Sequence, residues 1–304
     1  MRIRSLFSRV VDYLRIVVSS WSSFPNTHIR DIIIPMIRAE GLFRLTTAYL
    51  NRIATRVPEH DVHDAFDVLA EKMLASPRLR SVSPRMVSRP DIAHRSTFPD
   101  PQKSSGQFSS HDAKEFYRPG NFPNTERRMK MSEHSARVLV GKAVDWLALS
   151  EEERSGLTQV LVTCCTGLNA PGLDCEIVDD LGLSAGAERT MVGFMGCYAA
   201  INALKPARHI VRSDPKADVL MVNLELCTLY FQEAQHLEQV LSFLVFADGA
   251  AASLMAAREQ GFALDSFKAV MVPETGGLTS WKIPRLGFDL LLTGQVPGEL
   301  GHAA

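Results

Sequence analysis

Short apolar runs that alternate with helical patterns organise the second half of the chain. Runs typical of buried strands occupy residues 160–164, 189–194 and 217–223. Apolar residues at helical spacing fill the intervals near 172–181 and 198–211. Alternating strands and helices are typical of a sheet that is covered by helices and buried on both faces. The pattern therefore predicts a layered α/β fold.

Weaker patterns extend this prediction along the chain. Further strands are expected at 50–57, 250–255 and 263–272, and further helices at 62–74 and 126–147. Residues 96–124 are rich in Ser, Pro, Gly and charged residues, so we expect a loop there.

Residues 1–45 differ from the rest of the chain. Arg2, Arg4, Arg9 and Arg15 stand among aliphatic residues, a pattern shared by targeting peptides and amphipathic surface helices. The same pattern fits an upstream extension that takes no part in the fold, and we favour this interpretation. The recognisable fold is therefore expected to begin near residue 46.

The composition narrows the functional class. The chain has 304 residues, a hydrophobic fraction of 46% and a formal net charge of −1, which fits a globular protein with one large domain or two smaller ones. A nucleic-acid-binding protein would carry a concentrated basic excess, so no nucleic-acid partner is expected. No apolar run approaches the roughly 18–20 residues that span a bilayer, so no membrane span is expected either.

The number and spacing of the cysteines limit their chemistry. Five are present, with no Cys-x-x-Cys spacing and no secretory signal: Cys164, Cys165, Cys175, Cys197 and Cys227. We therefore expect neither a disulfide framework nor a metal site. Four of them are interpreted as buried small hydrophobic residues, and Cys197 is the exception.

Cys197 follows an apolar strand pattern that closes on Gly196, and it opens a helical pattern. The predicted helix has Ala200, Leu204, Ala207 and Val211 on one stripe. A helix N-terminus favours negative charge, which is where a thiolate nucleophile gains stability. Glycine permits the tight turn and the close approach of a substrate. Placement alone leaves two interpretations open, a reactive nucleophile and a packed core thiol.

Four motifs in order resemble those of bacterial type III polyketide synthases, the chalcone/stilbene synthase-like members of the thiolase superfamily. They are Val-Thr-Cys-Cys-Thr-Gly-Leu-Asn-Ala-Pro-Gly-Leu-Asp at 162–174, the nucleophile motif at 188–204, Val-Asn-Leu-Glu-Leu-Cys-Thr at 222–228, and Phe-Ala-Asp-Gly-Ala-Ala-Ala at 246–252. The resemblance runs from about residue 46 to the end and is most specific between 159 and 253.

The resemblance implies a thiolase-like fold with α-β-α-β-α layers, assembled as a homodimer. It implies an N-terminal half at 46–256 that carries the nucleophile, and the start of a second, truncated half at 257–304. The implied activity is acyl transfer: a cysteine takes an acyl group from an acyl-coenzyme A thioester and extends it by decarboxylative condensation with malonyl-CoA. The coenzyme A esters are substrates, no separate cofactor is implied, and the location is cytoplasmic.

Individual roles carry over to matching positions. The resemblance makes Cys197 the acyl carrier and Phe246 the aromatic gatekeeper between the coenzyme A tunnel and the cavity. The remaining positions are those that shape the cavity, cross the dimer contact or hold coenzyme A phosphates: Thr166, Cys227 and Tyr230; Ala170; Arg85 and Arg89. Without the resemblance, these residues would be interpreted as ordinary packing or as surface arginines.

The catalytic His and Asn of the family lie further past the nucleophile than the chain extends, so we expect both to be absent. His302 lies in an unrelated Gly-His-Ala-Ala tail, and His209 and His236 lie in predicted helices without family counterparts. Residues 281–300 resemble the sequence that precedes the catalytic His and Asn in members of the family.

Smaller differences from the family pattern also count against full catalytic activity. Pro206 falls inside a predicted helix, Ala247 replaces a glycine common in the family, and Pro84 and Pro90 interrupt the coenzyme A-binding region. A second function is therefore kept open, a catalytically inactive thiolase-fold fragment that at most dimerises or binds coenzyme A esters. Ketoacyl-carrier-protein synthase III and hydroxymethylglutaryl-CoA synthase share the fold and the nucleophile, but they lack the Gly-Phe-Met-Gly-Cys-Tyr and Leu-Glu-Leu-Cys contexts.

Overall fold

A computed structural model of the chain describes residues 46–65, 68, 74, 77, 80, 92–99, 116–118, 120–233, 237–243 and 245–303. The chain divides into two compact units, Met1–Leu45 and Thr46–Ala304, and every described residue belongs to the second. The predictions made for residues 1–45, Pro84, Arg85, Arg89, Pro90 and His236 lie outside the described residues.

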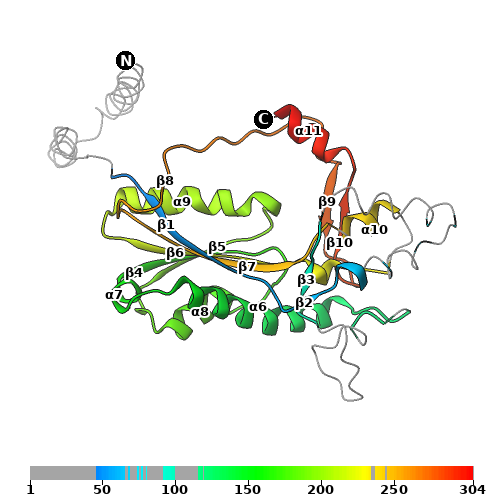
Figure 1. The fold of residues 1–304 in the computed structure, drawn as a ribbon, viewed down its shortest axis with the longest axis horizontal. Helices are drawn as coiled ribbons and strands as arrows, with labels where there is room; N and C mark the ends of the chain where they lie inside the picture. The colour runs from blue at the N-terminus through cyan, green and yellow to red at the C-terminus, as the bar shows by residue number, and fades with distance from the viewer. Residues whose placement is uncertain are drawn as a thin grey trace, which may run out of the picture. The chain divides into compact units, whose positions relative to one another are not determined.

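A six-stranded mixed sheet forms the centre of this unit, in the order β5-β4-β6-β7-β1-β8 (Figure 1). The strands are β1 (Tyr49–Arg56), β4 (Leu157–Thr163), β5 (Glu188–Val192), β6 (Asp218–Leu226), β7 (Asp248–Ala256) and β8 (Phe262–Ala263). Strand β4 runs parallel to β5 and β6, whereas β7 runs antiparallel to β6 and β1. The predicted strands at 50–57, 160–164, 189–194, 217–223 and 250–255 are thereby confirmed to within a few residues.

Helices cover both faces of the sheet, which confirms the layered α/β prediction. Figure 1 shows α6 (Thr125–Leu147) and α8 (Leu173–Leu181) on one face and α9 (Ala199–Ser213) on the other. The buried stripe of α9 is Ala199, Ala203, Ala207 and Val211, one position away from the predicted stripe at its start. The stripe is shifted because the helix begins at Ala199, directly after a 3-10 turn. Ala199 therefore faces the sheet, whereas Ala200 is only partly buried.

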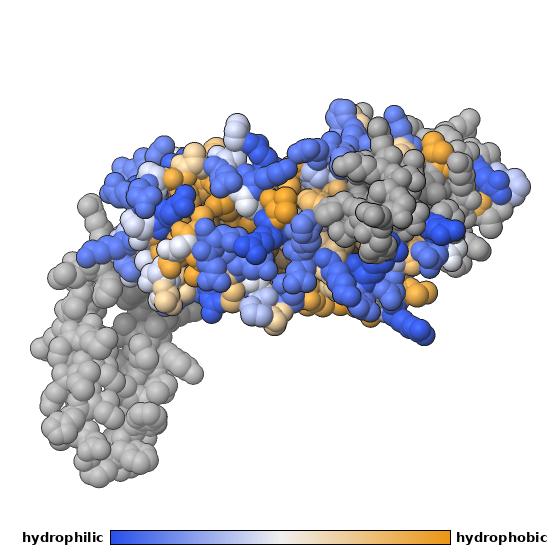
Figure 2. Space-filling view, turned by 90° about the horizontal axis from the view of Figure 1, so that it is seen from below, coloured by the Kyte–Doolittle hydropathy of each residue, from blue (hydrophilic) through white to orange (hydrophobic). Residues whose placement is uncertain are grey.

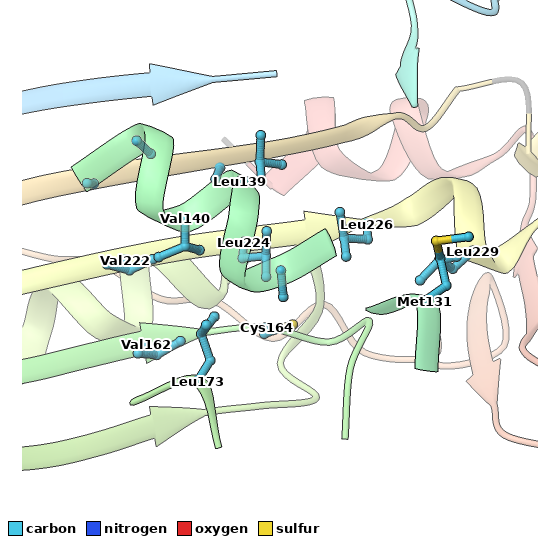
Figure 3. Packing of buried hydrophobic residues seen from close by; sticks show 14 of the residues in the cluster. Met131, Leu139, Val140, Val162, Cys164, Leu173, Val222, Leu224, Leu226 and Leu229 are labelled. Carbon is cyan, nitrogen blue, oxygen red and sulfur yellow. The ribbon is translucent and has the colours of Figure 1, made fainter. Parts of the chain in front are cut away.

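The larger hydrophobic cluster joins α6 to the middle of the sheet. Val140 of α6 lies beside Val222 of β6, and Leu173 of α8 lies beside Val162 of β4 (Figure 3). Burying a leucine or valine contributes about 1.5–3 kcal/mol, so this layer contact is a main source of stability. It also fixes the ends of the strands, where the site residues lie.

The carboxyl-terminal segments form a separate hairpin beside the sheet. The η2 turn (Cys227–Tyr230) follows β6, and α10 (Leu237–Phe243) precedes β7. Strands β9 (Thr279–Lys282) and β10 (Asp289–Leu292) pair antiparallel, and α11 (Val296–Ala303) follows. The Thr125 hydroxyl donates to the Pro284 carbonyl at 2.6 Å and accepts from the Gly287 amide at 2.9 Å, which ties the hairpin turn to the start of α6.

Two sequence predictions are wrong in detail. The strand expected at 263–272 is limited to the two residues of β8, which pair with Tyr49 and Leu50 of β1. After β8, the Arg208 side chain donates hydrogen bonds to the carbonyls of Leu264 and Asp265. These carbonyls are therefore not available for pairing with another strand. Within the predicted loop at 96–124, β3 (Ser96–Thr97) pairs with β2 (His60–Asp61).

The outer surface over α6 and α8 is mainly polar. Figure 2, seen from the side of these helices, shows polar residues interrupted by smaller hydrophobic patches. Exposed pairs such as Lys130 with Glu126 and Arg137 with Asp180 belong to this surface. In the part of the chain that the structure describes, we find no helix long and apolar enough to cross a membrane.

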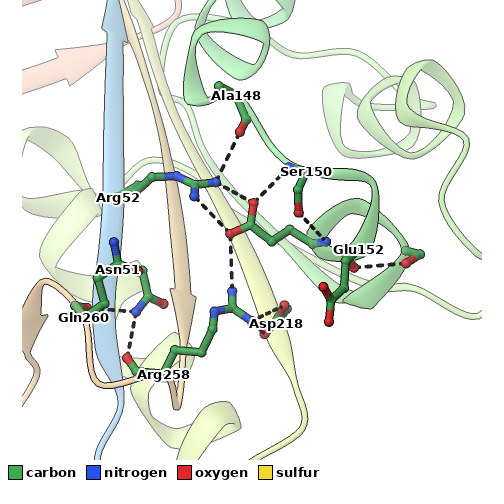
Figure 4. A network of polar contacts seen from close by, with 10 residues as sticks. Asn51, Arg52, Ala148, Ser150, Glu152, Asp218, Arg258 and Gln260 are labelled. Atoms are coloured by element: carbon green, nitrogen blue, oxygen red, sulfur yellow. Dashed lines mark hydrogen bonds and ion pairs between the residues drawn. The ribbon is translucent and has the colours of Figure 1, made fainter.

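An ion network holds the end of the sheet that lies away from the strand tips bearing the site. Glu153 of α7 (Glu151–Gly156) accepts from Arg52 of β1 at 2.7 and 3.0 Å, and Arg258 lies 4.0 Å from it (Figure 4). Arg258 also donates to Asp218, the first residue of β6, at 2.8 and 3.0 Å. Glu153 closes a capping box as well, because its amide donates to Ser150 Oγ at 3.1 Å and its carboxylate accepts from the Ser150 amide at 2.9 Å.

Replacing Ser150 with alanine is expected to lower the free energy of unfolding by about 1 kcal/mol, because the first turn of α7 loses its side-chain acceptor. Urea unfolding at neutral pH measures this. Ser155→Ala is the matched control, since its hydroxyl only donates to the Glu152 carbonyl at 3.0 Å on the same helix. Equal losses in the two variants would show that the cap contributes nothing of its own.

Candidate active site

Four chain segments meet at one end of the sheet. Strands β4, β5 and β6 are parallel, so their carboxyl ends lie together, with Thr163 opposite both Val192 and Asn223. Strand β7 is antiparallel to β6, and its first residue, Asp248, pairs with Leu226. The loops that leave β4, β5 and β6 and the segment that enters β7 therefore share one region, the usual place for ligands in open α/β sheets.

Cys197 lies on the loop that follows β5. The loop turns through Phe194 and Gly196, both in the left-handed region with φ of +57° and +70°, and then forms the η1 turn (Gly196–Tyr198). Helix α9 begins directly afterwards at Ala199, and Cys197 is exposed. The structure thus places the predicted nucleophile at a strand–turn–helix junction, where a helix N-terminus stabilises negative charge. A packed core thiol, the other interpretation, does not fit its exposure.

Cys165 lies beneath this turn. Burial, and next the nearby Glu225, raise the pKa of the Cys165 thiol, while the backbone N–H groups of Gly196, Met195 and Phe194 oppose that rise. These three amides therefore face the Cys165 sulfur. The loop that follows β4 and the nucleophile loop that follows β5 are in direct contact as a result.

Glu225 is a site residue that the sequence analysis missed. Its Oε1 accepts from the Cys165 amide at 2.9 Å, and burial raises the pKa of the carboxyl from its ordinary value of 4.5 to about 7. A carboxyl group with such a pKa can accept or donate a proton at neutral pH. The signal was present in the sequence, as a glutamate inside an apolar strand pattern.

The η2 turn directly follows β6, at the end of the sheet where the site residues lie. Burial raises the pKa of Cys227 well above its ordinary value, and Glu225, Asp248 and Cys197 add to the rise, which places Cys227 among these groups. Tyr230 is buried, and burial together with Glu225 and Cys227 raises the pKa of its hydroxyl. Cys227 therefore lies near Cys197, and Tyr230 lies near Cys227 and Glu225.

The other predicted site residues lie on the neighbouring segments. Thr166 is fully buried after β4, and its Oγ1 accepts from the Leu226 amide at 2.9 Å, so it joins β4 to β6. Phe246 is partly buried against the larger hydrophobic cluster, two residues before β7. Ala170 is exposed on the loop between β4 and α8. His209 is exposed on α9, and nothing is described of the His302 side chain.

An aromatic cluster connects the nucleophile loop to the hairpin. The Phe194 ring lies 5.0 Å from Trp281 of β9, which lies 5.9 Å from Tyr230 and stacks on Phe288 at 5.3 Å between ring centroids. Tyr230 and Phe288 meet edge to face at 4.8 Å. No role could be predicted for Trp281, because its contacts to Phe194 and Tyr230 join residues far apart in the chain. Within the described residues, no group of three or more His, Cys, Asp or Glu side chains is placed to hold a metal ion.

Comparison with known proteins identifies the family of part of the chain. Residues 123–259 match the family of chalcone and stilbene synthases, N-terminal domain. The alpha-pyrone synthesis polyketide synthase-like Pks18 of Mycobacterium tuberculosis is 32% identical over 229 residues, which are 74% of this chain and 56% of that protein. The chain therefore spans about half the length of the curated relatives it matches.

Solved structures share the fold. Germicidin synthase from Streptomyces coelicolor, a type III polyketide synthase, has a TM-score of 0.72 at 17% identity, over 85% of this chain and 73% of that chain. CsyB complexed with CoA-SH has a TM-score of 0.67 at 16% identity, over 84% of this chain and 70% of that chain. The matched domain spans Cys197, Thr166, Cys227, Tyr230 and Phe246. Residues 123–259 therefore form an N-terminal domain of the chalcone and stilbene synthase family, and the chain is a relative of the type III polyketide synthases.

Proposed function

We propose that the chain provides the acyl-loading site of a type III polyketide synthase. The Cys197 thiolate attacks the carbonyl of an acyl-coenzyme A thioester, a new carbon–sulfur bond to Cys197 forms, and the bond to coenzyme A breaks. Coenzyme A leaves as its thiolate and takes up a proton. In the extension step, malonyl-CoA loses carbon dioxide, and the resulting carbanion attacks the acyl carbonyl and releases the Cys197 thiolate.

The observation that carries the proposal is the exposed Cys197 at the junction of β5 and α9, inside the matched family domain. The coenzyme A bound in the structure of CsyB supports a coenzyme A ester as the substrate. Arg85 and Arg89 stay the predicted contacts to its phosphates, and Phe246 the predicted gatekeeper. No further cofactor enters the proposal, and substrates of this class place the proposed activity in the cytoplasm.

Incubation with a long-chain acyl-CoA is expected to add a single acyl group to the chain, because Cys197 is the exposed thiol of the site. Intact-mass analysis measures the adduct, and Cys197→Ala is expected to abolish it. Cys175→Ala is the matched control, since this partly buried cysteine lies on α8 and is expected to leave acylation unchanged. No adduct on the folded chain would favour the alternative, a fragment that at most dimerises or binds coenzyme A esters.

The proposal includes a homodimer formed through the edge of the sheet at β5. All but the last residue of β5 are exposed, and its Met191 is 45% exposed. The segments that follow β5 and β4 carry further exposed apolar side chains: Tyr198, Ile201 and Leu168, at 58%, 46% and 51% exposure. Unpaired edge strands and apolar patches of this kind favour pairing with a second chain. Ala170 lies near this edge on the loop after β4, in keeping with the dimer-crossing position that the resemblance gives it.

Ile201→Asp is expected to shift the chain from dimer to monomer, because a carboxylate would be buried without a partner in the contact. Sedimentation velocity over a range of concentrations measures this. Phe262→Asp on β8 is the control, since Phe262 is 74% exposed at the opposite edge of the sheet. A monomeric wild type, or an equal effect of both substitutions, would contradict the proposed contact.

A further inference from the structure

Arg128 is a buried cation that the proposed chemistry does not use. It lies in the first turns of α6 and is fully buried. Its Nη2 has no hydrogen-bond partner, and no carboxylate of the described residues forms an ion pair with it. Burial lowers the pKa of its guanidinium to about 10. An unpaired buried charge is costly, so its bonds must offset a substantial desolvation penalty.

The bonds of Arg128 go to three backbone carbonyls, two of which lie at the end of the η2 turn. Its Nε donates to the Pro123 carbonyl at 2.9 Å, and its Nη1 donates to the carbonyls of Leu229 and Phe231, the latter at 2.8 Å. These last two carbonyls flank Tyr230 on both sides. A single guanidinium nitrogen therefore fixes the backbone on which Tyr230 stands, and charge-assisted bonds of this kind are roughly twice as strong as neutral ones.

The guanidinium is also enclosed by the hairpin. A Cβ added to Gly287 would lie 2.2 Å from Arg128 Nε, so the glycine at this turn leaves the space that the guanidinium fills. Phe288, the next residue, packs edge to face on Tyr230. Arg128 thus holds the Tyr230 backbone from one side, while the hairpin holds the Tyr230 ring from the other.

Tyr230 reaches the nucleophile loop through the aromatic cluster. Its ring lies 5.9 Å from Trp281, which lies 5.0 Å from Phe194, three residues before Cys197. Its hydroxyl is close enough to Glu225, Cys227 and Cys165 for these groups to raise its pKa. Tyr230 therefore packs, through Trp281, on the loop that carries Cys197.

We propose that Arg128 is a positioning residue that holds Tyr230 as a wall of the site and thereby sets the length of the acyl chain that reaches Cys197. It acts through the η2 turn and touches no reacting atom. The part concerning acyl chains rests on the proposed function, whereas the control of access to Cys197 does not.

The test measures access with thiol reagents as well as with substrates. N-alkylmaleimides of increasing chain length react with Cys197 in any folded form of the protein, and peptide mass mapping separates this cysteine from the others. Arg128→Lys keeps the charge, but the lysine ammonium cannot occupy the guanidinium fork that reaches Pro123 and both flanking carbonyls. We expect it to change the ratio of long-chain to short-chain rate constants at Cys197 by about fivefold.

A double-mutant cycle with Tyr230→Ala separates this role from a merely structural one. If Arg128 acts through Tyr230, the ratio changes in Tyr230→Ala, and Arg128→Lys has no further effect in that background. Lys130→Met is the matched control, because this exposed lysine of α6 pairs with Glu126 and is expected to leave the ratio unchanged.

Three outcomes overturn the inference. The first is an Arg128→Lys effect of the same size with and without the Tyr230 side chain, and the second is an equal effect of Lys130→Met. The third is an unchanged ratio in Tyr230→Ala, which decides the question even if Arg128→Lys does not fold. A wild type that reacts with the maleimides but not with acyl-CoAs contradicts the proposed function and leaves this test intact.

Discussion

Replacing Asp248 with alanine is expected to lower the free energy of unfolding by roughly 3–5 kcal/mol, the largest loss from any single side chain of the site. The buried carboxylate accepts from the Thr228 amide and the Thr228 hydroxyl, both at 2.8 Å, and from the Phe98 amide at 3.0 Å. The Thr97 hydroxyl also donates to it at 3.4 Å. Alanine leaves these four buried or partly buried donors without this acceptor, and each such loss costs about 1–3 kcal/mol. Urea unfolding at pH 7 measures the change.

Two further variants make the result specific. Asp248→Asn keeps one acceptor oxygen, so its loss is expected to be intermediate. Asp180→Ala removes an exposed carboxylate that pairs with Arg137, and surface pairs of this kind contribute about 0–1 kcal/mol. If Asp248→Ala were no more harmful than Asp180→Ala, the carboxylate would not be the anchor of the η2 turn.

The importance of Asp248 follows from what it joins. It begins β7 two residues after Phe246, and through Thr228 it holds the turn that carries Cys227 and Tyr230. Arg128 holds the other end of the same turn through the carbonyls of Leu229 and Phe231. A buried anion and a buried cation thus fix the two ends of η2, while the apolar residues between them face the site and the core.

Much of the fold could be predicted because its strands are buried on both faces. Continuous apolar runs such as the one at 160–164 have no competing amphipathic interpretation, and α6 repeats its apolar residues over many turns. The strand–turn–helix junction at Cys197 could be predicted for a related reason, since a strand that closes on glycine before a helix is a local signal, whereas the role of Cys197 stays a prediction. The two-residue strand β8 could not, because its pairing depends on β1, far away in the sequence.

The polar framework of the site escaped sequence reasoning for a physical cause. Glu225, Arg128 and Trp281 owe their roles to contacts with residues far along the chain, as in the bond from Arg128 to the Phe231 carbonyl. Periodicity reports which face a residue takes, but it does not report which partner lies opposite. A charged residue inside an apolar pattern, as at Glu225, is the one local sign of such a partner.

Replacing Glu225 with glutamine is expected to stabilise the chain at alkaline pH and to remove one component of its pH dependence. The native carboxyl, with its pKa near 7, keeps its proton until well above the unfolded value of about 4.5. Between these values the native state binds more protons than the unfolded state, so the free energy of unfolding falls as the pH rises. Above pH 7 the full desolvation penalty of the charge is present.

Glutamine does not titrate and keeps an oxygen for the Cys165 amide, so the variant escapes this penalty. The difference in unfolding free energy between Glu225→Gln and wild type is expected to grow by roughly 2–3 kcal/mol from pH 5 to pH 8. Asp248, whose pKa burial raises to about 6, titrates in both proteins, so its contribution cancels in the difference. A difference that stays constant with pH would mean that Glu225 is ionised in the native site throughout this range. The carboxyl would then be unable to accept or donate a proton within the site at neutral pH.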